Sequence, residues 1–292
     1  MESSDGLRYV DAILAAGDSG LATAFARDLH WAYWPSPSAR SSSPEDFADA
    51  AARLTHRFCD AAGIRNGQRV LDVGCGIGGT LATMNDRFEN VVLDGLNIEP
   101  RQLAVARRKA VPRPANRIQF SAGNASRLPY RDGAFDVVLA LEAIFHFRDR
   151  QDFFREVRRV LKPGGMLAIT DFVPSRVLAP MLRMARKSAY EKNVREISGS
   201  VDITVTTDAY QRLAQSTGFD FIQQDDISRN VSPSYPMMRE LTRVVVRQNS
   251  GSRLKEISAD IGMRIGEMAL RAGLVRYMIL VFKVRRPTAA HR

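Results

Sequence analysis

Short apolar runs alternate with amphipathic stretches along most of this 292-residue chain. Runs rich in Val, Ile, Leu and Phe predict strands, and apolar residues at helical spacing between them predict helices. The predicted strands cover 70–73, 90–99 together with its exit, 118–121, 135–141, 166–170, 219–231 and 275–284. Because strands that alternate with helices build parallel sheets, the pattern indicates an α/β fold. We expect a seven-stranded, mostly parallel sheet with helices on both faces.

The predicted helices suggest how the chain is divided. One helix begins at Pro44, with Ser43 as its candidate N-cap, and ends at Gly63. Another covers 150–161, where apolar residues recur at helical spacing. We expect a helical N-terminal arm at 1–63, a core at 64–173, helical lid insertions at 174–205 and 232–272, and the C-terminal part of the core sheet at 206–231 and 273–286.

A glycine-rich turn follows the first predicted strand. Asp72 interrupts the apolar run, and Gly74, Gly76, Gly78 and Gly79 come directly after it. Glycine lets backbone N–H groups and a helix N-terminus approach a ligand where a Cβ atom would block it. The turn therefore predicts a cofactor site at the carboxyl end of this strand.

Two cofactor classes are consistent with this turn. The spacing Gly74-x-Gly76-x-x-Gly79 satisfies the dinucleotide pattern, and Asp94 lies twenty residues after Gly74, where a ribose-binding acid is expected. This favours an NAD(P)-dependent oxidoreductase. Asp72, however, resembles the acidic residue of motif I in the class I S-adenosylmethionine-dependent methyltransferases, which faces the methionine end of the cofactor.

Later segments resemble the methyltransferases and are not predicted by the dinucleotide hypothesis. Gly-Leu-Asn-Ile-x-Pro-x-Gln is similar to a motif of sterol, tocopherol and antibiotic-sugar methyltransferases, and the resemblance assigns Asn97 and Gln102 to the ribose hydroxyls. Residues 123–136 resemble the adenine-binding segment, which implies cofactor roles for Asn124 and Ala125. Arg-Val-Leu-Lys-Pro-Gly-Gly is again close to the family pattern. We therefore interpret the chain as a class I methyltransferase with a Rossmann-like sheet and S-adenosylmethionine as cofactor.

Three positions complete or modify that cofactor site. Asn97 stands where most members carry Asp or Glu, and Asn124 replaces a usual Asp. An amide oxygen still accepts a hydrogen bond, so cofactor binding is expected to persist. The resemblance also assigns Leu141, at the end of the fourth strand, to the cofactor site.

The segment His30-x-Ala-Tyr-Trp34 precedes the predicted core. It resembles a His-x-Gly-Tyr-Trp segment of many small-molecule methyltransferases, in which the tyrosine closes over the methionine end of the cofactor. The resemblance assigns this role to Tyr33, with Ala32 in place of the glycine. The alternative is that these aromatic residues anchor the arm to the core.

Candidate catalytic residues follow the fourth and fifth strands. A hydroxyl acceptor needs a base, and His146 and Asp171 are predicted at the same edge of the sheet. Sugar O-methyltransferases carry both in Leu-Glu-x-x-x-His and Ala-Asp-Phe. We hypothesise that His146 is the base and that Asp171 orients its imidazole. Glu142 is the alternative base, favoured for an alkene acceptor. A loop-holding role for His146 and a capping role for Asp171 are the structural alternatives.

Composition excludes several classes. With 45% hydrophobic residues the chain builds a full core, and two cysteines exclude a disulfide scaffold. The chain also lacks a cluster of ligating residues at metal spacing, so no metal is expected. No apolar run approaches the roughly 20 residues that span a bilayer, and the N-terminus does not resemble a signal peptide. The chain is therefore expected to be cytoplasmic.

The formal net charge is +10. Basic residues are spread along the chain, which argues against nucleic-acid binding and favours solvated helix faces. An anionic acceptor, such as a carboxylate, a phosphate or a carrier-bound acyl group, is the other explanation.

The expected function is O-methylation of a small molecule of the natural-product type. The alternatives are C-methylation of a prenyl or lipid acceptor, the NAD(P)-dependent oxidoreductase, and a noncatalytic protein that binds S-adenosylmethionine. A homodimer is a further expectation.

Overall fold

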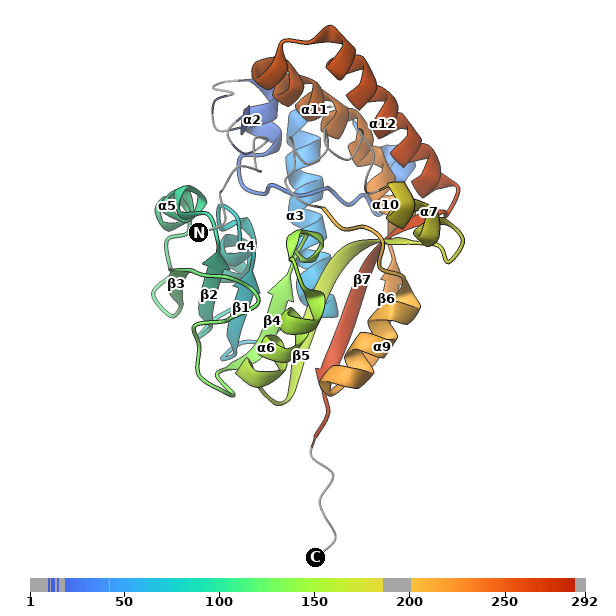
Figure 1. The fold of residues 1–292 in the computed structure, drawn as a ribbon. Helices are drawn as coiled ribbons and strands as arrows, with labels where there is room; N and C mark the ends of the chain where they lie inside the picture. Colours follow the sequence, from blue (N-terminus) through green and yellow to red (C-terminus); the bar gives the residue numbers. More distant parts are fainter. Residues whose placement is uncertain are drawn as a thin grey trace, which may run out of the picture. The chain divides into compact units, whose positions relative to one another are not determined.

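The computed structural model describes residues 10, 12, 13, 15, 19–41, 43–185 and 201–286 (Figure 1). Within these residues, seven strands form one sheet. They are β1 (Arg69–Val73), β2 (Val92–Asn97), β3 (Arg117–Ala122), β4 (Phe135–Ala140), β5 (Leu161–Pro174), β6 (Phe219–Asp226) and β7 (Val275–Val284). This confirms the predicted α/β fold. Residues 186–200 of the predicted lid insertion lie outside the described residues.

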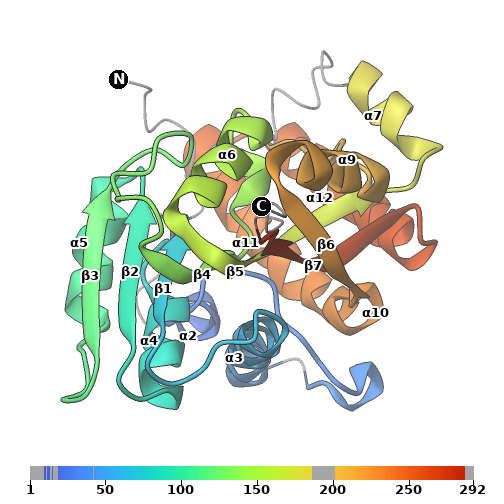
Figure 2. The same cartoon turned by 90° about the horizontal axis from the view of Figure 1, so that it is seen from below.

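The sheet order is β3-β2-β1-β4-β5-β7-β6 (Figure 2). β1 pairs in parallel with both β2 and β4, so that Asp72 lies opposite Gly95 on one side and Leu139 on the other. β3 and β5 extend the parallel pairing outward. Since successive strands are added in opposite directions from β1, the carboxyl ends of β1 and β4 flank a topological switch point. Open α/β sheets bind ligands there.

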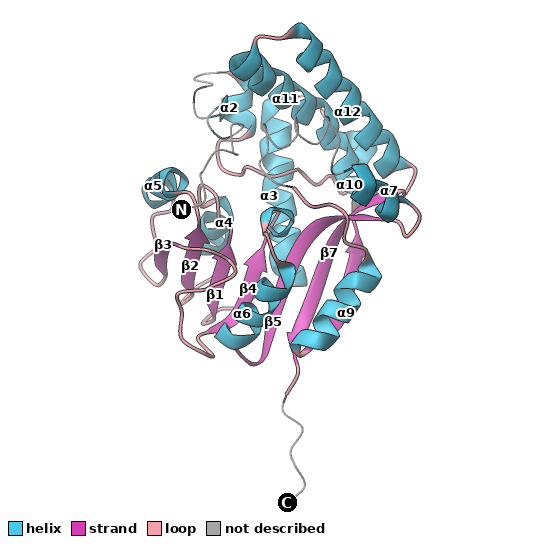
Figure 3. Ribbon diagram, viewed as in Figure 1, coloured by secondary structure: helices cyan, strands magenta, loops and turns pink. Residues whose placement is uncertain are grey.

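Helices connect these strands (Figure 3). Those before β5 are α2 (Gly20–Ala24), η1 (Pro37–Ala39), α3 (Pro44–Ala61), α4 (Gly79–Arg87), α5 (Pro100–Lys109), η2 (Ile144–His146) and α6 (Arg150–Val160). Those after it are α7 (Leu178–Ala185), α9 (Thr207–Thr217), α10 (Ser228–Val231), η3 (Ser232–Ser234), α11 (Tyr235–Ser250) and α12 (Arg253–Arg271). Among the described residues, no helix is long and apolar enough to cross a membrane.

Local chemistry explains where the helices begin. The hydroxyl of Ser43 accepts the N–H of Asp46 at 3.2 Å, as expected for an N-cap of α3. At α6 the carboxylate of Asp149 accepts the N–H groups of Gln151 and Asp152 at 2.7 and 3.1 Å. These bonds satisfy N–H groups that have no partner within the helix.

Residues 55–171, 207–225 and 279–292 form one of two compact units. Its core contains an aromatic cluster in which the Phe154 ring lies 5.1 Å from Phe282 and 5.7 Å from Phe219, both edge to face. These rings are fully buried. Such packing holds α6 against the sheet.

The other unit comprises the described residues within 1–54, 172–206 and 226–278, with α11 and α12. Two strand predictions have wrong bounds. The strand predicted at 166–170 is longer, since Leu161 already pairs with Phe135 and β5 continues to Pro174. The segment 219–231 is a strand only to Asp226, whose carboxylate accepts the N–H and the hydroxyl of Ser228 at 3.0 and 2.5 Å. This local turn ends the strand and starts α10. The division into arm, core and lid stays a prediction.

Candidate active site

The glycine turn after β1 has a left-handed backbone. The φ angles of Gly74, Gly76 and Gly78 are 82°, 52° and 86°. The N–H groups of Gly74 and Cys75 both donate to the carbonyl of Leu96, at 2.7 and 3.1 Å, which ties the turn to β2. A Cβ atom at position 74 would lie 2.5 Å from the Cβ of Ala143. Glycine is therefore required at this position by its dihedral angle and by the close approach of Ala143.

Asp72, before the glycine turn, and Cys75, between Gly74 and Gly76, are both buried. Burial raises the pKa of the Cys75 thiol well above its ordinary value, and the charge of Asp72 raises it further. The thiol therefore stays protonated near neutral pH and is a poor nucleophile.

The predicted ribose pair meets at the carboxyl end of β2. The Asn97 amide donates to the side-chain oxygen of Gln102 at 2.8 Å, and the Asn97 oxygen accepts the N–H of Ile98 at 2.8 Å. Both side chains are buried. Gln102 therefore holds Asn97 in place, and the Asn97 oxygen keeps a second lone pair.

Asp94 lies in the middle of β2 and has a structural partner. Its two carboxylate oxygens accept from Nε and Nη2 of Arg69 at 3.0 and 3.2 Å. The hydrogen bond to Asp94 raises the pKa of Arg69 despite partial burial. Asp94, which the dinucleotide hypothesis assigns to the ribose, is thus held by Arg69 in a bidentate ion pair in the middle of β2.

The segment after β3 forms a local turn. The Asn124 side-chain oxygen accepts the N–H of Ser126 at 2.9 Å, and its backbone carbonyl accepts the N–H of Arg127 at 3.0 Å. Asn124 is exposed, whereas Ala125 and Leu128 are buried. The segment therefore presents one polar side chain next to an apolar wall.

Arg159 on α6 holds the rest of this segment. Its guanidinium donates to the carbonyls of Tyr130 and Leu128 at 2.6 and 2.9 Å, and to the carboxylates of Asp132 and Glu156. Glu156 in turn accepts the N–H of Leu128 at 2.8 Å. The hydrogen bonds that Arg159 donates to Glu156 and Asp132 raise the pKa of its guanidinium. The loop is thus fastened to α6 by a fully occupied guanidinium.

The segment after β4 contains a strained residue. Glu142 has a φ of 50°, a left-handed conformation that is uncommon outside glycine. Its N–H donates to the hydroxyl of Thr170 on β5 at 2.8 Å, which stabilises this conformation. His146 follows at the end of η2, half-buried, with its ring 4.6 Å from that of Phe145. Strain of this kind concentrates at functional sites.

Asp171 on β5 is completely buried. Its Oδ2 accepts from Nη2 of Arg150 at 3.0 Å and from the hydroxyl of Tyr210 at 2.5 Å. Burial, and then the charge of Asp171, raise the pKa of Tyr210 well above its ordinary value. Tyr210 is therefore a neutral donor, and Arg150 compensates the carboxylate. The orientation of His146 by Asp171 stays a prediction.

Asp171→Asn should therefore destabilise the fold, because it removes the carboxylate charge that pairs with the buried guanidinium of Arg150. Breaking such a pair costs about 3–5 kcal/mol. Thermal unfolding should show a clear fall in Tm. The double variant Arg150→Met, Asp171→Asn should recover part of that loss, since it removes the second charge. Losses that simply add would contradict the coupling.

Tyr33 belongs to the unit with α11 and α12. Its N–H donates to the carbonyl of Ala50 at 2.9 Å, so its backbone is attached to α3. Neighbouring Trp31 packs edge to face on Phe172 and Tyr235, at 5.2 and 4.7 Å. These contacts agree with the anchoring alternative for this aromatic segment. The closing role of Tyr33 stays a prediction.

The comparisons with known proteins now decide the family. Residues 71–169 match the model of a methyltransferase domain. The 27-O-demethylrifamycin SV methyltransferase of Amycolatopsis mediterranei is 35% identical over 217 residues, which cover 73% of this chain and 74% of that protein. The chain belongs to the class I S-adenosylmethionine-dependent methyltransferases. It is thus an enzyme with S-adenosylmethionine as cofactor and a small molecule as acceptor.

Two further similarities show the breadth of this methyltransferase's relatives. Sterol 24-C-methyltransferase erg6 of Schizosaccharomyces pombe is 33% identical over 199 residues, 68% of this chain and 52% of that protein. The crystal structure of the [4+2]-cyclase SpnF has a TM-score of 0.72 at 22% identity and covers 96% of this chain and 94% of that chain. The second likeness shows the fold alone.

Sequence reasoning missed the side chains that fasten the site. Arg150 and Tyr210 reach Asp171 from α6 and α9, and Arg159 reaches the segment after β3 from the end of α6. Arg150 is buried at the start of α6, but its burial is known only from the structure, and no local sequence pattern identifies Arg150 or Tyr210.

Proposed function

We propose that this methyltransferase transfers a methyl group to an oxygen of a natural-product-type small molecule, with His146 as general base. The observation that carries the proposal is the segment after β4, where the strained Glu142 and the half-buried His146 lie at the carboxyl end of a central strand. The rifamycin relative acts, by its name, on an oxygen, which supports the assignment.

The residues around the glycine turn fit the cofactor by their chemistry. The lone pair left on Asn97 suits a ribose hydroxyl, with Gln102 as its support. Asn124 offers an exposed acceptor for an adenine amine, with Ala125 and Leu141 as apolar neighbours. We assign the methionine end to Asp72, to Gly74, Gly76 and Gly78, and to Tyr33. When bound, S-adenosylmethionine supplies a methyl carbon activated by a sulfonium.

The proposed work of the chain is to position the acceptor and take its proton. His146 can accept a proton from a hydroxyl when its imidazole is neutral. Glu142 lies four residues earlier and is the alternative base. Holding the acceptor oxygen in line with the methyl carbon and the sulfur of the cofactor then supplies most of the rate enhancement, as expected for a displacement at carbon.

C-methylation of a prenyl or lipid acceptor is the second candidate. The observation that favours it is the likeness to a sterol C-methyltransferase, together with the strained carboxylate at Glu142. A carboxylate is suited to stabilise and deprotonate the cation formed when an alkene is methylated. Under this alternative Glu142 is the essential base and His146 is secondary.

Transfer from carbon-13-labelled S-adenosylmethionine, with the product examined by NMR, tests the proposal directly. We expect that products formed from a library of polyketides and sugar-bearing acceptors will carry the labelled carbon as a methoxy group. A C-methyl carbon from an alkene acceptor would instead support the second candidate, and would contradict the first.

Transfer should proceed without a divalent metal. Among the described residues, no group of three His, Cys, Asp or Glu side chains is arranged to hold a metal ion. Rates measured with EDTA and with added magnesium should therefore agree. Loss of activity in EDTA and its return with magnesium would overturn this prediction and indicate a metal-bound, diphosphate-bearing acceptor.

An anionic acceptor and a cytoplasmic location are further parts of the proposal. The net charge of +10 supports an anionic group on the acceptor, because an excess of positive charge attracts such molecules. Competition between neutral and carboxylated acceptors tests the first point, and cell fractionation tests the second.

We also propose a homodimer through α12. Its exposed apolar residues, Leu254, Ile257, Ile261, Ile265 and Met268, are 51–79% exposed. The stripe is symmetric about Ile261, since Leu254 and Met268 lie seven residues away and Ile257 and Ile265 lie four. A symmetric stripe can pair with its own copy about a two-fold axis. Light scattering should give a dimer mass for the native chain and a monomer for Ile261→Lys. A native monomer would contradict this.

A further inference from the structure

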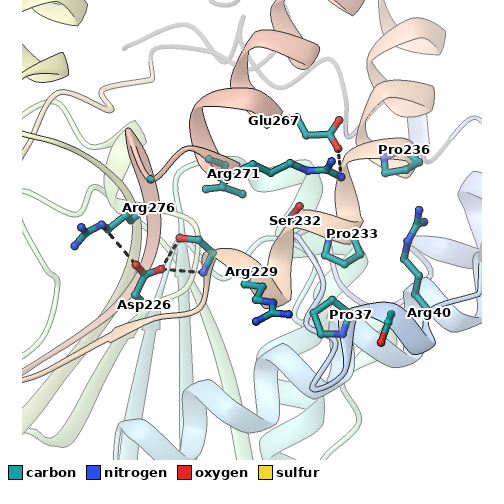
Figure 4. Close-up of a pocket in the computed structure, with 14 residues that line it drawn as sticks. Pro37, Arg40, Asp226, Arg229, Ser232, Pro233, Pro236, Glu267, Arg271 and Arg276 are labelled. Atoms are coloured by element: carbon teal, nitrogen blue, oxygen red, sulfur yellow. Dashed lines mark hydrogen bonds and ion pairs between the residues drawn. The ribbon is translucent and has the colours of Figure 1, made fainter.

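A pocket of about 750 Å³ lies within the compact unit that contains α11 and α12 (Figure 4). Its volume is in the range of small-molecule sites. Four arginines and two acids line it: Arg40, Arg229, Arg271, Arg276, Asp226 and Glu267. With four arginines and two acids, the lining therefore carries a formal net charge of +2.

Both acids already have partners. Glu267 accepts from Arg239 at 2.5 Å and from Arg271 at 2.7 Å. Asp226 accepts from the N–H and hydroxyl of Ser228 and faces Nε of Arg276 at 3.6 Å. Neither carboxylate is therefore left to neutralise the remaining arginines.

Arg40 and Arg229 are those remaining arginines. In the part of the chain that the structure describes, neither has an ion pair or hydrogen bond through its guanidinium, and both are exposed. They come from different segments and flank Pro37 in the view of Figure 4. Two guanidinium groups gathered at one pocket repel each other unless an anion lies between them.

Hydrogen bonds hold the two segments together. The N–H of Trp34 donates to the carbonyl of Asn230 at 3.0 Å. In return, the Asn230 amide donates to the carbonyls of Trp34 and Pro35 at 2.8 and 3.3 Å. Asn230 directly follows Arg229, and Pro35 precedes the turn that carries Arg40. The arrangement of the two arginines is thus built into the backbone.

Three prolines and Leu270 give the lining an apolar part, next to three serines and Gly273. Pro37, Pro233 and Pro236 restrict the backbone of two lining segments, and Leu270 comes from a third, α12. An occupant would therefore meet guanidinium groups at one part and apolar surface at another. A guanidinium group can donate two parallel N–H···O hydrogen bonds to one phosphate group. Arginine side chains therefore favour a phosphate as the ligand of this pocket.

We propose that this pocket binds a phosphate-bearing small molecule, with Arg40 and Arg229 on the phosphate and the prolines and Leu270 against its organic part. The inference goes beyond methyl transfer and does not depend on the identity of the acceptor.

Calorimetric titration of the full chain with inorganic pyrophosphate tests the site. We expect binding that weakens as salt is raised, and an affinity at least about tenfold lower in the double variant Arg40→Gln, Arg229→Gln. The double variant Arg253→Gln, Arg264→Gln removes the same charge from α12 outside the lining and should bind as the native chain does. S-adenosylhomocysteine should bind all three proteins equally, which shows that they are folded.

Several results would overturn the proposal. They are absence of pyrophosphate binding to the native chain, equal binding by the Arg40, Arg229 variant, or an equal loss in the α12 control. Sedimentation with phosphatidate vesicles distinguishes a lipid headgroup from a free phosphate. Vesicle binding that requires both arginines, without pyrophosphate binding, would also overturn a small-molecule site.

Discussion

His146→Ala is expected to lower kcat by about 10²–10⁴-fold, because the acceptor hydroxyl loses the base that takes its proton. The affinity for S-adenosylhomocysteine should barely change, because the proposed role of His146 is toward the acceptor and the cofactor is assigned to other residues. In the native enzyme the rate should also fall in acid, because a protonated imidazole cannot accept a proton. Steady-state kinetics over a range of pH measures both effects.

Glu142→Gln is the matched comparison for this prediction. It removes the alternative base and keeps the size of the side chain and the hydrogen bond from its backbone N–H to Thr170. If His146 is the base, Glu142→Gln should retain most of kcat and a normal fall in acid. A His146→Ala enzyme with near-native kcat, together with an inactive Glu142→Gln enzyme, would contradict the assignment of His146 as the base. That result would favour the C-methylation alternative.

Gly76→Val should abolish cofactor binding. Residue 76 has a left-handed φ of 52°, which a β-branched side chain rarely adopts. A valine there would also place methyl groups where the bare backbone is proposed to meet the methionine end of the cofactor. Titration with S-adenosylhomocysteine should show no heat of binding at concentrations that saturate the native enzyme.

Gly63→Val separates strain from steric block. Gly63, after α3, has a similar φ of 66°, and a Cβ atom there would meet no heavy atom within 4 Å. It shares the dihedral cost but lies outside the glycine turn. We expect Gly63→Val to lower Tm and to bind S-adenosylhomocysteine normally. Equal loss of binding in both variants would mean that general destabilisation explains the effect at Gly76.

The strands and most helices could be predicted because their signals are local. Apolar runs and the turn residues around them are enough to locate β1 to β5, and Ser43 and Pro44 mark the start of α3. The extent of β6 could not be predicted, because Ile227 and Val231 let the alternation of apolar and polar residues continue beyond Asp226. One carboxylate that bonds to Ser228 ends it.

The candidate site could be predicted only where one segment carries several of its residues. Asn97 and Gln102 are five residues apart, and they meet in the structure. Arg150 and Tyr210 lie 21 and 39 residues from Asp171, and only the packing of α6 and α9 brings them together. Arg40 and Arg229 lie still farther apart in the sequence and line the same pocket. No local motif predicts that they meet.

The account depends most on the glycine turn being a site for S-adenosylmethionine and not for a dinucleotide. Calorimetric titration of the native chain with S-adenosylhomocysteine and, separately, with NAD⁺ tests this directly. We predict micromolar binding of S-adenosylhomocysteine, about −8 kcal/mol, and no binding of NAD⁺. Binding of NAD⁺ without binding of S-adenosylhomocysteine would contradict the account.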